Sequence, residues 1–290
     1  MTTATGVHPT AEASVALDLM PTVVIRNRNE SAHLQLVLAA LAAQDVPHSV
    51  VVVDNASDDD SVEVARRAGA TVVPLSKGAF TYGRALNVGL AQASGSVCVI
   101  LSAHSLPIGP SFLRNCLEPF ADPRVAATRC LYAGKRADAQ RWMAPETLTS
   151  SSDVDTVVSK GPLASGCAVR RRVWEEIPFD ETASAAEEKL WALAVLARGY
   201  TISSPCHAAY TYLKPIGPVD AILKNGRELI EIHRRTGQKL GFLRRGASAA
   251  SVDMAVALFR RAPAAAWRAV QEECARTYVR WIAARGGAVR

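Results

Sequence analysis

Four consecutive valines that run into an acidic, turn-forming segment constrain the fold more than any other stretch. They form residues 50–53 of the sequence VVVVDNASDDDS, and Asp54 follows them directly. A short run of β-branched residues is typical of a buried strand in a parallel sheet. Because parallel sheets bind ligands at the carboxyl ends of their strands, the pattern predicts that Asp54 lies at a ligand-binding edge.

Strand-like and helix-like segments alternate over the first hundred residues. Strands are predicted at 22–25, 50–53, 71–74 and 97–101; helices are predicted at 32–43 with Ser31 as cap, from Asp60 or Ser61 to near Gly69, and at about 82–93. This order predicts an α/β fold with a mostly parallel central sheet, right-handed crossovers and flanking helices. The polar loops after residues 25, 53 and 101 should then share one edge.

The pattern is mixed beyond Pro107. A helix near 111–120, a strand near 125–132 and a loop region at 134–166 precede an apolar helix at 187–198 that ends at Gly199. From residue 215 the sequence is helical and basic. We therefore expect a flexible tail (1–20), one α/β domain (21–214) and a C-terminal helical region (215–290).

Composition is that of an ordinary globular protein. Of 290 residues, 49% are apolar and 21% are charged, which excludes a disordered chain. No stretch of 18 apolar residues and no secretion signal is present, so we expect no membrane span. Six cysteines without a CxxC pair favour reduced thiols in a cytoplasmic protein. The net charge of +6 is moderate, and its basic patches could suit a phosphate-bearing ligand, an anionic membrane surface or simple solvation. We expect no nucleic-acid partner.

Four segments together resemble a known enzyme family. They read VVIRNRNE, VVVVDNASDDDS, FTYGRALNVGLAQASGSVCVILSAHSLP and FDETASAAEEKLWALAVLARGY. In this order they resemble the inverting glycosyltransferases of family 2, and the similarity spans residues 21–214. The resemblance implies a GT-A (Rossmann-like) fold and transfer of a sugar from a UDP- or dTDP-sugar to an acceptor hydroxyl.

The resemblance implies that the first two loops hold the nucleoside. Asp54 and Glu30 occupy the positions of the family's acidic residues, and Arg26 and Asn27 lie on the same strand end as Glu30. An ionised carboxylate suits the imide N–H of uracil or thymine, because it only accepts hydrogen bonds. The alternative is that Asp54 merely forms a turn. For the acids at 58–60 we prefer such a structural role, as a helix start.

The donor diphosphate is expected near residues 83–89. This segment resembles the family's phosphate-binding stretch and includes Arg84 and Asn87, although Leu86 stands where many relatives carry a basic residue. A guanidinium group suits a diphosphate. The alternative is a solvated charge on a helix face, with Lys77 as a substitute cation.

The metal motif of the family is altered in this chain. Residues 102–104 read Ser-Ala-His where an Asp-x-Asp motif is usual, and the segment 209–212 lacks the family's second histidine. Ala103 and His104 thus belong to the expected donor site. Since Mn²⁺ and Mg²⁺ prefer oxygen ligands, we hypothesise that metal binds weakly or not at all. His104 with Arg84 or Lys77 would neutralise the diphosphate; alternatively, His104 binds metal or is a structural loop residue.

Two adjacent acids are the candidate catalytic pair. Glu187 and Glu188 correspond to the family's Glu-Asp pair, so the resemblance implies that Glu188 is the general base toward the acceptor hydroxyl. The alternative is two acids that favour a helix N-terminus. Gly166 lies in a small-residue turn expected near the sugar pocket. Trp191 could stack on a sugar, but its helical spacing favours the core.

The sequence indicates the acceptor and the binding partners only as broad classes. We expect a small-molecule, glycan or lipid-linked acceptor, in cell-surface or natural-product glycosylation of the bacterial type. The basic, apolar C-terminal helices could pack on the domain, form a homodimer, or contact an anionic membrane at its inner face. Other functions left open are a nucleotide-sugar-binding protein without catalysis and a nucleotidyltransferase, although the latter's Gly-rich phosphate loop is absent.

Overall fold

The computed structural model describes residues 20–134, 145–204, 206–214 and 216–237, together with Glu272, Arg276 and Val279. The expected tail, except Met20, and most of the C-terminal region lie outside the described residues. The expectations of a membrane contact or dimer interface through the C-terminal helices therefore concern residues that are not described. No helix in the described part is long and apolar enough to cross a membrane.

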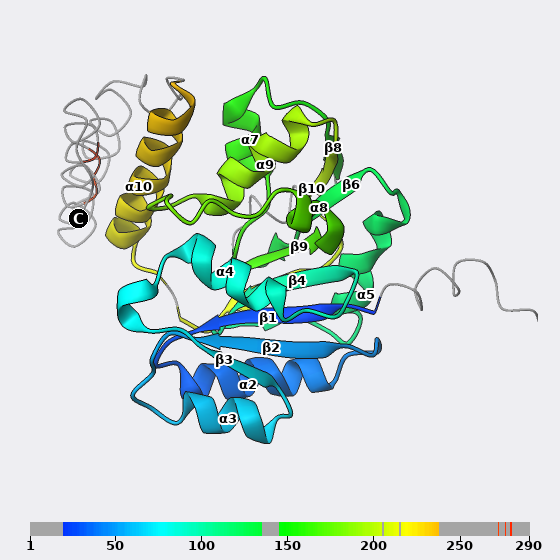
Figure 1. Cartoon of the computed structure of the whole chain (residues 1–290), viewed down its shortest axis with the longest axis vertical. Coiled ribbons are helices and arrows are strands. Elements are labelled where there is room, and N and C mark those ends of the chain that lie inside the picture. Colours follow the sequence, from blue (N-terminus) through cyan, green and yellow to red (C-terminus); the bar gives the residue numbers. More distant parts are fainter. Residues whose placement is uncertain are drawn as a thin grey trace, which may run out of the picture.

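An eight-stranded mixed sheet forms the centre of the protein (Figure 1). In spatial order its strands are β3 (Thr71–Pro74), β2 (Ser49–Asp54), β1 (Thr22–Asn27), β4 (Val97–Ser102), β9 (Gly166–Arg170), β6 (Val125–Arg129), β10 (Thr201–Ser204) and β8 (Glu146–Leu148). The first four strands are mutually parallel, whereas β9 runs antiparallel to both β4 and β6, and β8 is antiparallel to β10. The mostly parallel α/β sheet predicted from the sequence is confirmed.

Helices cover both faces of this sheet. Its helices are α2 (Ser31–Ala42), α3 (Ser61–Arg67), α4 (Tyr82–Ala91), α5 (Phe112–Leu117), α8 (Arg171–Glu176) and α9 (Glu187–Ala197), with short 3-10 turns η1 (Lys77–Ala79) and η2 (Glu118–Ala121). Alternate residues of β1 face opposite layers: Val23 and Ile25 pack with α2, α3 and α5, whereas Val24 packs with α4, α8 and α9. A strand buried on both faces explains the uninterrupted apolar runs in the sequence.

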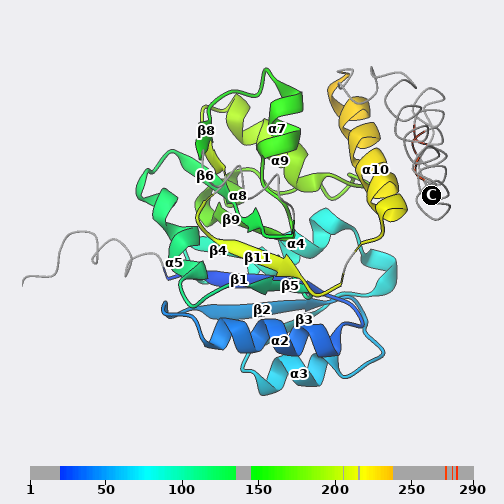
Figure 2. The same ribbon diagram turned by 180° about the vertical axis from the view of Figure 1, so that it is seen from behind.

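A small second sheet lies against the first (Figure 2). It contains β5 (Ser105–Pro107), β11 (Ala209–Tyr212) and β7 (Leu131–Tyr132), with β11 in the middle. Helix α7 (Val154–Lys160) and the long α10 (Pro218–Thr236) complete the described elements, and both pack near α9 through a small apolar cluster that includes Val154, Ala186 and Ile232.

The structure corrects three expectations. The strand expected at 125–132 is divided at Cys130 between β6 and β7, which belong to different sheets. The expected loop region 134–166 contains β8 and α7. Ser31 does not cap α2: the N-cap residue is Glu30, without a side-chain cap, and the Ser31 N–H donates to Asp59 Oδ2 at 2.9 Å. The Asp59 carboxylate of the neighbouring loop thus accepts a hydrogen bond from a backbone N–H that has no partner within the first turn of α2.

Candidate functional site

The carboxyl ends of β1, β2 and β4 lie side by side at one edge of the sheet. In register, Asn27 is opposite Asp54 and Arg26 is opposite Ser102. The chain therefore brings together the three polar loops that the sequence pattern placed at this edge. The strands that carry them are buried, so the loop positions are fixed by the core.

Backbone strain marks the same region. Among the described residues, the non-glycine residues with positive φ are Asn29 (51°), Ala56 (48°) and Ala186 (61°). They follow β1, follow β2 and directly precede α9. Left-handed backbone costs energy for such residues and persists where the surroundings hold it in place, commonly at functional sites. The strain therefore supports a site formed by these loops and the start of α9.

Asp54 is buried and its carboxylate is held by neighbours. Oδ1 accepts hydrogen bonds from Asn27 Nδ2 at 2.8 Å and from Ser57 Oγ at 2.6 Å, and Oδ2 accepts from the Ser57 N–H at 3.0 Å. These bonds form a turn, as the structural interpretation expected. A carboxylate has about four acceptor positions, so one remains for a ligand.

Glu30 lies at the centre of a charged cluster. Its Oε1 is 3.0 Å from Lys214 Nζ and 3.6 Å from His104 Nδ1, and its Oε2 contacts His33. Burial favours the neutral acid, but hydrogen bonds from His33 and Lys214 outweigh it and hold the pKa of Glu30 below its ordinary value. The cluster joins the β1 loop, the β4 loop and the segment after β11.

The surroundings of His104 favour its neutral imidazole. Burial lowers the pKa of its imidazole, and the opposing charge of Glu30 does not compensate. The ring packs beside Tyr212, with 5.5 Å between ring centroids. Its Nδ1 is buried without a hydrogen-bond partner among the described residues. His104 therefore offers an uncharged nitrogen to the edge of the sheet, and the cation beside it is Lys214.

The residues at this position do not fit a hard divalent cation. Mg²⁺ and Mn²⁺ favour several oxygen ligands, with carboxylates to offset their charge. Here one carboxylate, Glu30, lies beside His104, and the Lys214 ammonium group is 3.0 Å from the oxygen that faces the imidazole. A lysine thus takes the place that a metal would need on that carboxylate.

Arg26 connects the sheet edge to the candidate catalytic pair. Its Nη1 is 3.2 Å from Glu187 Oε1, its Nη2 donates to the Ala164 carbonyl at 3.1 Å, and its guanidinium carbon lies 5.3 Å from the centroid of the Tyr82 ring. Both Glu187 and Glu188 are buried at the start of α9. Arg26 thus pairs with Glu187, the first of the two acids.

The raised pKa of Glu187 predicts that the free energy of unfolding depends on pH. Burial and the adjacent Glu188 charge raise this pKa to about 7 from 4.5, against the opposing effect of Arg26. The folded state then binds more protons than the unfolded state between these values. We expect the free energy of unfolding to fall by on the order of 3 kcal/mol, relative to Glu187→Gln, as pH rises from about 5 to 8.

Urea unfolding of both proteins at the two pH values measures this difference. Glu63→Gln is the matched control, because Glu63 is an exposed acid in the first turn of α3. Its pH dependence should follow that of the unmodified chain. Equal pH dependence in Glu187→Gln and the unmodified chain would contradict the raised pKa.

Two charged residues near the candidate catalytic pair, one buried and one half-buried, were not predicted from the sequence. Lys189 is buried and its Nζ donates to the carbonyls of Gly161 (3.1 Å) and Pro162 (2.6 Å), so it ties the 161–165 turn to α9. Burial lowers the pKa of Lys189 to about 8. Glu228 of α10 is near enough to Glu188 that burial and this charge raise its pKa. The position of Lys189, three residues before the buried Ala192 on the same helix, was the sequence signal that could have identified it.

The residues predicted to bind the diphosphate lie apart from His104. Arg84 is exposed on α4, and Lys77 pairs with Asp58 at 3.2 Å. Asn87 is bonded internally: its Nδ2 donates to the Phe179 carbonyl, and its Oδ1 accepts from the Trp174 Nε1–H and the Phe179 N–H. In the described part of the chain none of the three pairs with His104. Asn87 holds α4 to the segment before α9.

The remaining predicted residues have structural contacts. Ala103 is buried and its N–H donates to the Arg26 carbonyl at 3.1 Å. Trp191 lies in the core, where its Nε1–H donates to the Ile177 carbonyl at 2.6 Å and its ring packs on Phe179. This agrees with its helical spacing. Gly166 begins β9 and lies directly against the buried ring of Tyr210.

Gly166→Ala tests this close approach. A Cβ at residue 166 would lie 2.2 Å from Tyr210 Cε1, so the tyrosine must move from its buried position. We expect a loss of about 1–3 kcal/mol in the free energy of unfolding, measured by urea denaturation. Gly78→Ala is the control, since no atom lies within 4 Å of its added methyl group. Equal stability of the two variants would contradict the contact.

A family model matches more than half of the chain. Residues 22–177 match the family model described as "Glycosyl transferase family 2". No curated protein sequence matches the chain.

Several solved structures share the fold at low sequence identity. A mannosyltransferase, PcManGT from Pyrobaculum calidifontis in complex with GDP-Man and Mn²⁺, has a TM-score of 0.62 at 19% identity over 92% of this chain and 74% of that one. Glucosyl-3-phosphoglycerate synthase from Mycobacterium tuberculosis, with Mn²⁺, UDP and glucosyl-3-phosphoglycerate, has 0.58 at 18%, over 82% and 88%. S. aureus TarS 1-349 has 0.57 at 17%, over 94% and 93%.

Proposed function

Because the chain belongs to glycosyl transferase family 2 and has the GT-A fold, we propose that it transfers a sugar from a UDP- or dTDP-sugar to an acceptor hydroxyl with inversion. The observation that carries the proposal is the convergence of three groups at one sheet edge: the Asp54 turn, the Glu30 cluster, and the Arg26–Glu187 pair that leads to Glu188. Family membership also favours glycosyl transfer over nucleotidyl transfer.

Asp54 and Glu30 are the proposed nucleoside residues. The free acceptor position of Asp54 suits the imide N–H of uracil, and a charge-assisted hydrogen bond to a buried carboxylate is strong. The related synthase carries UDP in its structure, whereas the related mannosyltransferase carries GDP-Man. Guanine also has an N–H that a carboxylate can accept, so the base is the first quantity to measure.

Lys214 is the proposed cation for the leaving diphosphate. We prefer it to Arg84 or Lys77 because its ammonium group is 3.0 Å from Glu30 Oε1, whereas Lys77 pairs with Asp58. A fixed positive charge at a developing phosphate charge lowers the barrier without a metal. His104, being neutral, would contribute a hydrogen bond rather than a charge.

Glu188 is the proposed general base. Inverting transfer needs one carboxylate that takes the proton of the acceptor hydroxyl while that oxygen attacks the anomeric carbon from the face opposite the diphosphate. Glu187 is held by Arg26 and, through its raised pKa, carries a proton for part of the time at pH 7. Because Glu187 is partly protonated, the electrostatic repulsion that it exerts on the adjacent Glu188 carboxylate is reduced.

A thermal-shift screen of nucleotides and nucleotide sugars tests the donor. We expect UDP or dTDP to raise Tm, and Asp54→Asn to weaken UDP binding about 10-fold or more, because the charge-assisted bond is lost. Asp58→Asn is the control, an exposed acid in the same loop. Unchanged UDP affinity in Asp54→Asn, or stabilisation by guanine nucleotides alone, would contradict the proposed donor.

A further inference from the structure

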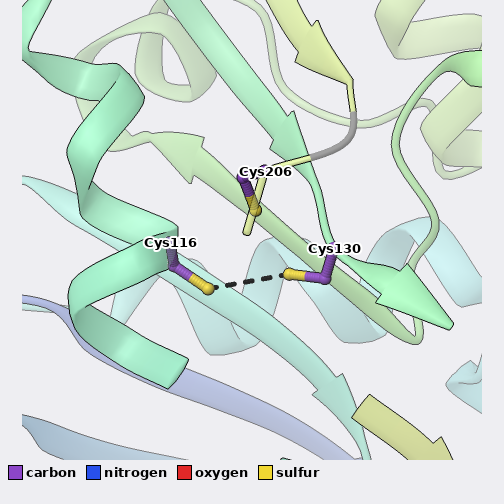
Figure 3. Close-up of side chains that lie close together, drawn as sticks. All are labelled: Cys116, Cys130 and Cys206. Atoms are coloured by element: carbon purple, nitrogen blue, oxygen red, sulfur yellow. Dashed lines mark hydrogen bonds between the residues drawn. The ribbon is translucent and has the colours of Figure 1, made fainter. Parts of the chain in front are cut away.

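Three cysteine side chains from separate elements meet in the interior, away from the sheet edge described above (Figure 3). Cys116 lies on α5, Cys130 lies between β6 and β7, and Cys206 lies in the connection from β10 to β11. All three are buried, and their Sγ atoms lie within 4.8 Å of one another. Cys98 and Cys167, also buried free thiols, do not belong to this group.

The spacing of the sulfur atoms fits ligands of one metal ion. Cys116 Sγ and Cys130 Sγ are 3.6 Å apart. Two thiolates about 2.3 Å from the same tetrahedral Zn²⁺ lie roughly 3.8 Å apart, whereas a disulfide would bring two sulfurs to about 2.0 Å and leave the third unpaired. A mutual group of three thiols therefore corresponds to one face of a zinc tetrahedron.

One of the three cysteines borders the protein surface. Cys206 lines a surface cavity of about 360 Å³ whose other lining residues include Glu118, Asp122 and His207. A water molecule from this cavity would complete a four-coordinate shell around an ion held by the three thiolates.

From this geometry we propose that Cys116, Cys130 and Cys206 bind one Zn²⁺ as thiolates, at a site independent of sugar transfer. Binding releases the thiol protons to solvent, so affinity for zinc rises with pH. The ion would fasten α5 to two of the connections between the two sheets, β6 to β7 and β10 to β11, where the Leu131 N–H already donates to the Ala208 carbonyl at 2.8 Å. The segment so fixed continues through β11 to Lys214.

Metal analysis of the purified chain tests the site. We expect elemental mass spectrometry to find about one zinc ion per chain. The zinc should be lost in Cys130→Ala but kept in the control Cys98→Ala, because Cys98 is a buried thiol outside the cluster. Added Zn²⁺ should raise Tm of the demetallated chain and leave Cys130→Ala unchanged. Stoichiometric copper in place of zinc would overturn the choice of metal.

A spectroscopic measurement on the unmodified chain covers the case in which the variant does not fold. Co²⁺ added to the demetallated protein should give an intense thiolate-to-cobalt absorption in the near ultraviolet, and added Zn²⁺ should abolish it. Absence of both zinc and this absorption would overturn the proposal. An intact mass about 2 Da lower, with residues 116 and 130 joined in one peptide pair, would overturn it in favour of a disulfide.

Discussion

Glu188→Gln is expected to lower kcat about 100- to 10,000-fold, the range that a general base contributes, while the affinity for the nucleotide stays unchanged. Glutamine fills the same volume at the start of α9 but cannot take a proton from the acceptor. Since Glu188 is separated from the Asp54 turn, loss of the base should not disturb the nucleoside. Initial rates of transfer and calorimetric titration with UDP measure the two effects separately.

A matched surface variant controls for the effect of Glu188→Gln. Glu175→Gln, a change at a half-exposed surface ion pair on α8, serves as control and should keep the full rate. A retained rate in Glu188→Gln would refute the assignment and favour a nucleotide-sugar-binding protein without catalysis.

Local sequence patterns predicted the elements that carry the site. The valine run is β2, which ends at Asp54, and α9 begins at Glu187 as its two acids indicated. Both predictions depend on neighbouring residues alone: a β-branched run specifies a buried strand, and acids favour a helix N-terminus. The convergence of loops after β1, β2 and β4 followed from the parallel topology.

Contacts between distant residues could not be predicted in this way. Lys214 reaches Glu30 across 184 positions, and Arg26 reaches Glu187 across 161. Strand β9 was missed for a related reason: GCAVR is short, lacks alternation, and is stabilised by antiparallel pairing with both β4 and β6. Which cation approaches His104 depends on how β11 inserts into the small sheet, and no motif specifies that.

Lys214→Met should lower kcat about 100- to 1,000-fold, the cost of removing one group that stabilises charge in the transition state. Methionine keeps most of the aliphatic stem, so the main loss is the ammonium group beside Glu30. Lys77→Met and Arg84→Met remove the rival cations and should keep the rate. Because Lys214 is the cation in this proposal, exhaustive chelation should also leave the rate of the unmodified chain unchanged. A complete loss of the transfer rate on chelation, restored by Mn²⁺, would contradict this proposal. It would mean that Lys214 moves away from Glu30 when the donor binds, and that Glu30 and His104 then face a metal.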